Sequence, residues 1–235
     1  MRQRLLSENT SWEDAYNVVA YVADALALVG TEGDEEVDAL AAQVEQLLGV
    51  WEGLDGERRR ERRRIGRANA QVRRRDVQAD VQVTLLHDEV LEHVAGERTS
   101  PLFLGFFPDP LPTVVRMSLG SELPVLRVLL GKLREPETPA ALRERHEGPL
   151  GRIIEQGTAA IQAREEAFAG AGRTAARMAT WRDDAGQVLA EVEEALHRIA
   201  TARGHGGDWV DAFFVGVESP RKTEDKAGSP AGGTP

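Results

Sequence analysis

The chain contains 235 residues, no cysteine and a formal net charge of −10 at pH 7. The absence of cysteine excludes disulfide bonds, thiolate metal ligands and cysteine nucleophiles, and the acidic balance argues against a protein that coats nucleic acid with its whole surface. Hydrophobic residues make up 41% of the chain but aromatic residues only 5%. Because Ala, Leu, Arg and Glu are abundant and favour helices over strands, we expect an all-α fold.

Residues 11–53 predict two helices. Ser11 and Asp14 have the spacing of a capping box, and apolar residues at helical spacing continue to Gly30. The acids at 34–36 would begin the second helix, because negative charge stabilises the positive end of the helix dipole. Three glycines between residues 49 and 56 weaken that helix, so we expect a kink or a short break there.

A longer helix is predicted from about Asp55 to Ala95, and Gly96 is its expected stop. Its second half is amphipathic, with apolar residues at helical spacing: Val77, Val81, Leu85, Leu86, Val90 and Val94. Its first half is strongly basic. Between Glu57 and Arg75, ten arginines and two glutamates give a net charge of +8, which leaves −18 for the rest of the chain.

The ten arginines are the sequence feature with the most functional weight. They are Arg58, Arg59, Arg60, Arg62, Arg63, Arg64, Arg67, Arg73, Arg74 and Arg75. Five of them fall roughly along one side of the predicted helix, an arrangement that suits phosphate groups: Arg60, Arg64, Arg67, Arg74 and Arg75. No aromatic residue interleaves the run, so stacking on single-stranded bases has no support. The acids of residues 32–38 are alternative partners for the arginines, within the chain or in a neighbouring copy.

Two apolar segments with aromatic residues follow the long helices, at 101–110 and 208–217. We expect each to form a packed loop or a short strand, and the two strands would make a small pair. Their aromatic residues are Phe103, Phe106, Phe107, Trp209, Phe213 and Phe214. These side chains either cap the ends of the core or form an exposed patch for self-assembly or partner docking.

The remaining elements are also predicted to be helical. Helices are expected over 113–119, over 121–133 and from Thr138-Pro139, where proline suits the first helical position. Gly148-Pro149 would interrupt the chain before a second long helix over about 150–203. Residues 218–235 have the composition of a disordered tail.

The order of these parts repeats, which indicates an old tandem duplication. Phe106-Phe107 matches Phe213-Phe214 at an offset of 107 residues, and Gly66-Arg67 matches Gly172-Arg173 at 106. Chance agreement between two helices of similar composition is the alternative. We therefore predict a first helical repeat at 1–110 and a second at 111–217, packed about a pseudo-twofold axis as one elongated helical bundle.

The sequence contains no complete catalytic motif. Glu194 and His197 have the spacing of a di-metal carboxylate site, but the matching positions in the first repeat are Asp88 and Leu91. The sequence lacks a glycine-rich phosphate loop and the Gly-x-Ser-x-Gly element that presents a nucleophilic serine. We therefore predict no catalytic residue, no metal and no cofactor.

The sequence favours a non-catalytic interaction or structural protein that self-associates or docks a protein partner. The alternative is a nucleic-acid or anionic-surface binder that uses the Arg58–Arg75 helix. No stretch reaches the ~20 apolar residues of a membrane helix, and no apolar segment follows the basic residues of the first turn, so we expect a cytoplasmic protein.

Overall fold

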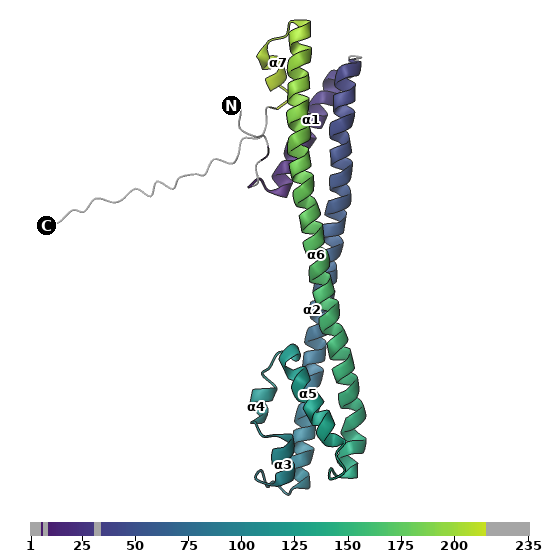
Figure 1. Cartoon of the computed structure of the whole chain (residues 1–235), viewed down its shortest axis with the longest axis vertical. Coiled ribbons are helices and arrows are strands. Elements are labelled where there is room, and N and C mark those ends of the chain that lie inside the picture. Colours follow the sequence, from purple (N-terminus) through teal and green to yellow (C-terminus); the bar gives the residue numbers. More distant parts are fainter. Residues whose placement is uncertain (1–5, 7–8, 31–33, 215–235) are drawn as a thin grey trace, which may run out of the picture. The chain divides into compact units, whose positions relative to one another are not determined.

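A computed structural model describes residues 6, 9–30 and 34–214, and all the regular structure of these residues is helical. The helices are α1 (Trp12–Gly30), α2 (Glu35–His93), α3 (Pro101–Phe106), α4 (Leu111–Val114), α5 (Leu119–Leu133), α6 (Ala140–Arg203) and α7 (Gly207–Asp211) (Figure 1). The all-α prediction is confirmed. Residues 215–217 and the predicted tail at 218–235 lie outside the described residues.

The helices form two compact units. The terminal unit comprises Met1–Leu54 and Arg177–Pro235, and the central unit comprises Asp55–Ala176. Each unit contains residues of both predicted repeats, 1–110 and 111–217. The duplication and its pseudo-twofold axis therefore stay predictions.

In the terminal unit, α1, the N-terminal part of α2 and the C-terminal part of α6 share one hydrophobic core. The predicted capping box is present, since the backbone N–H of Asp14 donates to Ser11 Oγ at 3.1 Å and Ser11 Oγ donates to Asp14 Oδ2 at 2.7 Å. Aromatic rings in contact join the three helices: the Trp51 ring is stacked on Tyr16, with centroids 5.7 Å apart, and tilted against Trp181, with centroids 4.7 Å apart. The indole N–H of Trp181 donates to the carbonyl of Leu47 at 2.9 Å.

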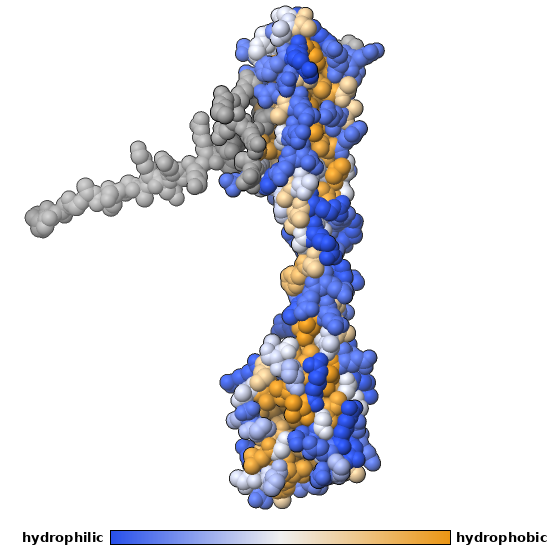
Figure 2. All heavy atoms as spheres, viewed as in Figure 1, coloured by the Kyte–Doolittle hydropathy of each residue, from blue (hydrophilic) through white to orange (hydrophobic). Residues whose placement is uncertain are grey.

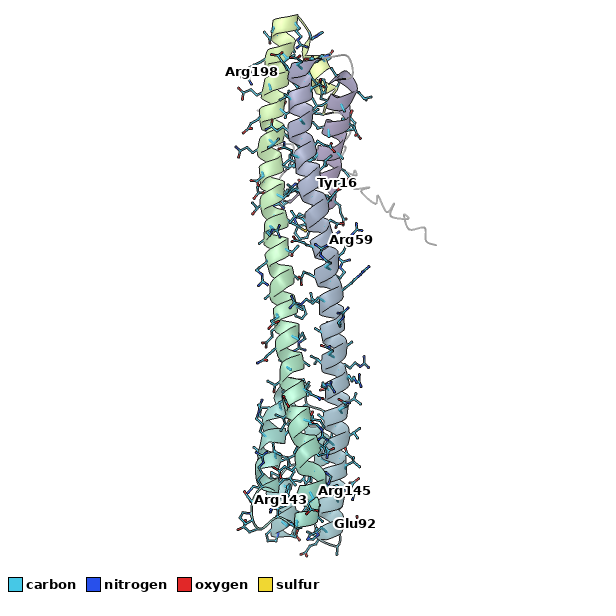
Figure 3. The ribbon with its side chains drawn as sticks, turned by 90° about the vertical axis from the view of Figure 1, so that its right-hand side faces the viewer. Tyr16, Arg59, Glu92, Arg143, Arg145 and Arg198 are labelled. Atoms are coloured by element: carbon cyan, nitrogen blue, oxygen red, sulfur yellow. The ribbon has the colours of Figure 1, made fainter. Side chains whose placement is uncertain are left out.

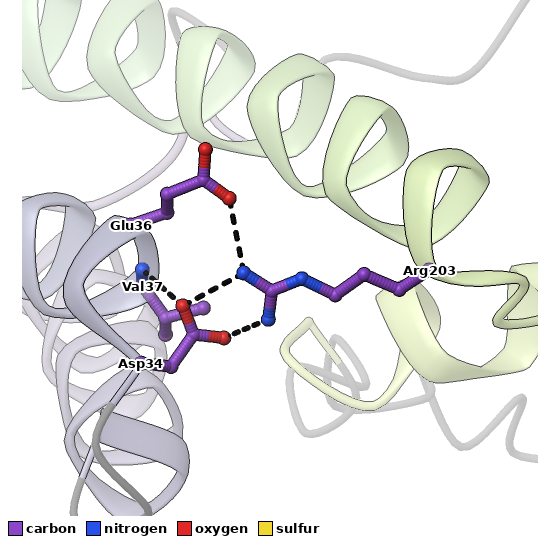
Figure 4. A network of polar contacts seen from close by, with 4 residues as sticks. All are labelled: Asp34, Glu36, Val37 and Arg203. Atoms are coloured by element: carbon purple, nitrogen blue, oxygen red, sulfur yellow. Dashed lines mark hydrogen bonds and ion pairs between the residues drawn. The ribbon is translucent and has the colours of Figure 1, made fainter.

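An ion-pair network joins the start of α2 to the end of α6 (Figure 4). The guanidinium of Arg203 donates to both carboxylate oxygens of Asp34 and, from Nη2, to Glu36 Oε2 at 3.0 Å. Asp34 also accepts from the backbone N–H of Val37 at 3.4 Å and so caps α2. The hydrogen bond from Arg203 is the main reason that the pKa of Asp34 lies below its ordinary value.

In the central unit, α5 packs against both α2 and α6 over a core of leucine and valine side chains. Gly157 permits the close approach of α5 to α6, because a Cβ atom there would lie 3.1 Å from Leu123 Cδ2. The side chains of Arg127 and Thr158 bridge the same two helices with a hydrogen bond of 3.1 Å. Helix α2 ends as predicted, with Gly96 at a φ of 84° just beyond its last turn.

Both long helices are more continuous than the sequence indicates. The predicted break at the glycines of residues 49–56 is wrong, because α2 runs through them from Glu35 to His93. The predicted interruption at Gly148-Pro149 is also wrong, since Pro149 lies inside α6. A proline costs a helix about 3 kcal/mol, and here three side chains one turn apart on α6 are buried and offset that cost: Leu142, His146 and Leu150.

The aromatic segments at 101–110 and 208–214 contain the short helices α3 and α7 and no strand, so the predicted strand pair is wrong for these described residues. Phe103 and Phe106 lie in α3, where Ser100 Oγ accepts from the Phe103 backbone N–H at 3.2 Å and caps the helix. Phe213 lies in the turn that follows α7. The helix predicted over 113–119 is instead the single turn α4, because the chain leaves it before α5 begins at Leu119.

Candidate functional site

All ten predicted arginines lie on α2 within the central unit, and four of them have partners. Arg58 and Arg59 contact Asp55, with Arg58 Nε 3.0 Å from Oδ1 and Arg59 Nη2 2.5 Å from Oδ2. Arg64 Nη2 lies 3.3 Å from Glu166 Oε2 on α6, and Arg75 donates to Gln78 Oε1 at 2.6 Å. Although burial alone favours the neutral acid, the hydrogen bonds from Arg58 and Arg59 lower the pKa of Asp55.

The other six arginines are exposed and make no ion pair or hydrogen bond with the residues that the structure describes: Arg60, Arg62, Arg63, Arg67, Arg73 and Arg74. The predicted stripe is therefore only partly available to a ligand, because Arg64 and Arg75 have partners within the chain. The acids of residues 34–38 belong to the terminal unit, where Asp34 and Glu36 bind Arg203 instead.

One side of α2 is exposed along the central unit, and we call it the α2 face. Its members recur every three or four residues: Arg60, Arg63, Arg67, Ala70, Arg74, Val77, Val81, Leu85, Asp88 and Glu92. The face is basic in its first part, apolar in the middle and acidic at its end. Figure 3 labels Glu92 on this helix, together with Arg59.

The apolar middle of this face corrects a sequence prediction. Val77, Val81 and Leu85 belong to the predicted amphipathic stripe, yet they are 55%, 54% and 50% exposed. The buried side of this part of α2 carries Ala79 and Val83, which the stripe lacks, together with Leu86 and Val90, which belong to it. At 100° per residue the two apolar lines lie on opposite sides of the helix, and α5 and the adjoining part of α6 cover only one.

A groove runs beside this apolar line, between α2 and α6. Its α2 wall contains Val77 and Val81, and its α6 wall contains Pro149 and Ile153. Figure 2 shows orange apolar surface among the blue over the unit that holds α3, α4 and α5.

The aromatic residues predicted for docking are mainly packing residues. Phe103, Phe106 and Phe107 are buried in the central core, and Phe213 is buried in the terminal core. Trp209 and Phe214 are partly buried against the terminal core. A docking role for these six side chains stays an untested prediction.

A buried histidine joins α6 to α2 in the central unit. His146 is 2% exposed; its Nδ1 lies 2.8 Å from Gln82 Nε2 and its Nε2 lies 2.9 Å from Glu89 Oε2. With the amide donating to Nδ1, the ring proton lies on Nε2 and is donated to Glu89. Arg145 Nη1 holds the other oxygen of Glu89 at 3.2 Å. This network is fully paired, as buried polar groups require.

Glu122 of α5 is a second buried polar residue of the central unit and, unlike His146, it is not paired with any described residue. It is fully buried, and neither of its carboxylate oxygens has a hydrogen-bond partner among the residues that the structure describes. Burial, and then the charges of Asp80 and Asp76 on α2, raise its pKa to about 8. Burial and Asp76 also raise the pKa of Asp80. The carboxyl group of Glu122 is therefore protonated and uncharged at neutral pH, and burying an uncharged acid costs less free energy than burying a carboxylate.

His197, which was weighed for metal binding with Glu194, contacts another residue of α6. His197 Nε2 lies 3.9 Å from Glu193 Oε1 on the same exposed turn. Across residues 6, 9–30 and 34–214, no three His, Asp or Glu side chains are grouped so as to hold a metal ion. In the same part of the chain, no helix is both long enough and apolar enough to cross a membrane.

Comparisons of the chain with family models, with curated proteins and with solved structures found no match.

Sequence reasoning missed the residues that distinguish the central unit. Only the apolar residues one turn away on either side signal that His146 and Glu122 are buried: Leu142 and Leu150 flank His146, and Leu119 and Leu126 flank Glu122. The exposed apolar line on α2 was predicted as part of one amphipathic stripe, because spacing alone does not tell which side of a helix a neighbour covers.

Proposed function

We propose that this chain is a non-catalytic protein that acts by associating with copies of itself through helix surfaces. The observation that carries the proposal is the apolar line of Val77, Val81 and Leu85, at least half exposed. It lies beside a groove whose lining is half apolar and half polar. Apolar surface that is contiguous and rimmed by charged groups is typical of interaction sites. Covering three half-exposed side chains contributes about 1 kcal/mol each.

The α2 face supports this proposal better than the aromatic segments do. The side chains of Phe103, Phe106 and Phe107 already stabilise the central core, so a partner would have to open that core to reach them. Val77, Val81 and Leu85 are accessible without any rearrangement of the described helices.

Replacing Val81 by glutamate is the first test of the proposal. The substitution puts a charge in the middle of the apolar line, and we expect association to weaken about tenfold or more because a desolvated, unpaired carboxylate opposes it. Light scattering after size-exclusion chromatography, over about a hundredfold range of protein concentration, measures the mass. Val128→Glu is the matched control, since Val128 is 62% exposed but lies on α5. Equal masses for the two variants at every concentration would contradict the proposal.

An anionic ligand for the arginines is the second candidate function. It is favoured by the six exposed arginines that have no partner among the described residues. We expect retention of the chain on immobilised DNA to fall steeply with salt, because each phosphate contact releases a counterion. Replacing Arg60, Arg62 and Arg63 by glutamine should abolish the retention. Retention that survives the triple substitution would rule out this candidate.

A further inference from the structure

We infer that a second copy of this chain covers the α2 face, with the two α2 helices antiparallel about a twofold axis at Val81. The inference rests on the proposed self-association and specifies its geometry. A twofold interface brings the same surface of both copies together, so that surface must be complementary to itself.

The order of residues along the α2 face has this self-complementarity. Val77 and Leu85 are each four residues from Val81, so an antiparallel copy places them opposite one another. Arg74 and Asp88 are each seven residues from Val81, so they also lie opposite one another. Residues four and seven apart share one side of a helix, and all five side chains are exposed there.

The two charged groups are available for contacts between copies. Arg74 has no ion pair or hydrogen bond with the described residues. The side chain of Asp88 is 67% exposed, and among the described residues its one polar contact is with Nδ1 of the neighbouring His87, at 2.9 Å. The antiparallel arrangement forms two Arg74–Asp88 contacts around an apolar centre. A parallel arrangement would place Arg74 beside Arg74 and Asp88 beside Asp88, and like charges in contact disfavour an interface.

An anionic surface is a poorer occupant of the same face. A phosphate backbone laid along α2 meets arginines in the first part but the carboxylates of Asp88 and Glu92 at the end. The apolar centre also offers nothing to a phosphate. A second copy satisfies the basic, apolar and acidic parts at once.

The test exchanges the two charges. Arg74→Glu alone puts two acid–acid contacts in the interface, and Asp88→Arg alone puts two arginine–arginine contacts there, so each variant should self-associate about tenfold or more weakly than the wild type. A mixture of the two variants restores both opposite-charge contacts, and the mixed dimer should form about as tightly as the wild-type dimer. Sedimentation with one variant fluorescently labelled measures each affinity. Arg63→Glu, an equal change of charge on the same face outside the paired region, should leave the affinity unchanged.

Cysteine pairs give a second, independent readout because the chain has no cysteine of its own. A disulfide requires Cβ atoms about 3.5–4.5 Å apart. Under mild oxidation, a mixture of Val77→Cys and Leu85→Cys chains should therefore cross-link to each other, and Val77→Cys chains alone should not.

The outcomes separate the geometry from the proposed function. One set of results would keep self-association and overturn the antiparallel geometry. In it, Val81→Glu lowers the mass, the mixture of Arg74→Glu and Asp88→Arg does not restore the dimer affinity, and Val77→Cys chains cross-link with each other. A wild-type chain that stays monomeric overturns both the proposed self-association and its antiparallel geometry. Loss of DNA binding in Arg74→Glu, with a gain in Asp88→Arg and no change in mass, overturns the inference in favour of the anionic ligand.

Discussion

Replacing Trp181 by alanine is expected to lower the free energy of unfolding by about 4 kcal/mol, the range measured for truncation of buried aromatic residues. Trp181 is 3% exposed and packs on Trp51, which in turn stacks on Tyr16. The substitution removes the α6 contribution to a ring cluster that joins three helices, and it also removes the hydrogen bond to the carbonyl of Leu47. Urea unfolding followed by circular dichroism at the helix band measures the loss.

Two further variants make this result specific. Trp181→Phe keeps a ring in the cluster and loses the indole N–H, so its loss should be smaller, about 1–2 kcal/mol. Phe168→Ala removes a ring that is 52% exposed on the same helix and should change stability by less than about 0.5 kcal/mol. Similar losses for Trp181→Ala and Phe168→Ala would show that the cluster does not stabilise the terminal unit.

Replacing Glu122 by glutamine is expected to stabilise the protein increasingly as the pH rises. The folded state holds the proton of Glu122 up to a pKa of about 8, whereas the unfolded chain releases it near the ordinary value of 4.5. Between these two values the folded state binds more protons, so rising pH costs the wild type stability, and above the folded pKa the loss is complete. Glutamine is neutral throughout and avoids the loss, which we expect to reach about 5 kcal/mol at pH 9.

Urea unfolding of the wild type and of Glu122→Gln at pH 5, 7 and 9 measures this difference. The two free energies should nearly agree at pH 5 and should diverge through pH 7 to pH 9. Glu144→Gln, an exposed position on α6, is the matched control and should follow the wild type at all three values. Parallel curves for Glu122→Gln and the wild type would mean that Glu122 is not held as a buried acid in the folded state.

Much of the helical fold is predictable from local spacing. The capping box at Ser11 and Asp14 and the stop at Gly96 follow from nearby residues alone, and both are present. The predicted interruptions of α2 and α6 are wrong because the prediction considers only the local free-energy cost of glycine and proline in a helix. Gly53 and Pro149 disfavour a helix by at most about 3 kcal/mol, and buried neighbours such as Trp51 and Leu150 outweigh that cost through contacts with distant parts of the chain.

The apolar part of the α2 face is exposed because α5 and α6 cover the other side of α2. The sequence of α2 alone does not determine which side they cover. Leu85 and Leu86 are adjacent and equally apolar, yet one is half exposed and the other is fully buried. Glu122 was missed for a related reason, since a single acid in an apolar helix gives no sign of burial until its partner helices are known. The basic cluster itself was predictable, but its pairing with Asp55 and Glu166 was not.

Sedimentation velocity of the wild-type chain, over a range of concentrations and at low and high salt, tests the claim of self-association most directly. We predict a mass that rises from one chain to two as concentration increases. High salt should weaken the dimer by screening the exposed charges, and it should leave a dimer held by the apolar centre. A mass of one chain at every concentration and salt level would contradict the account.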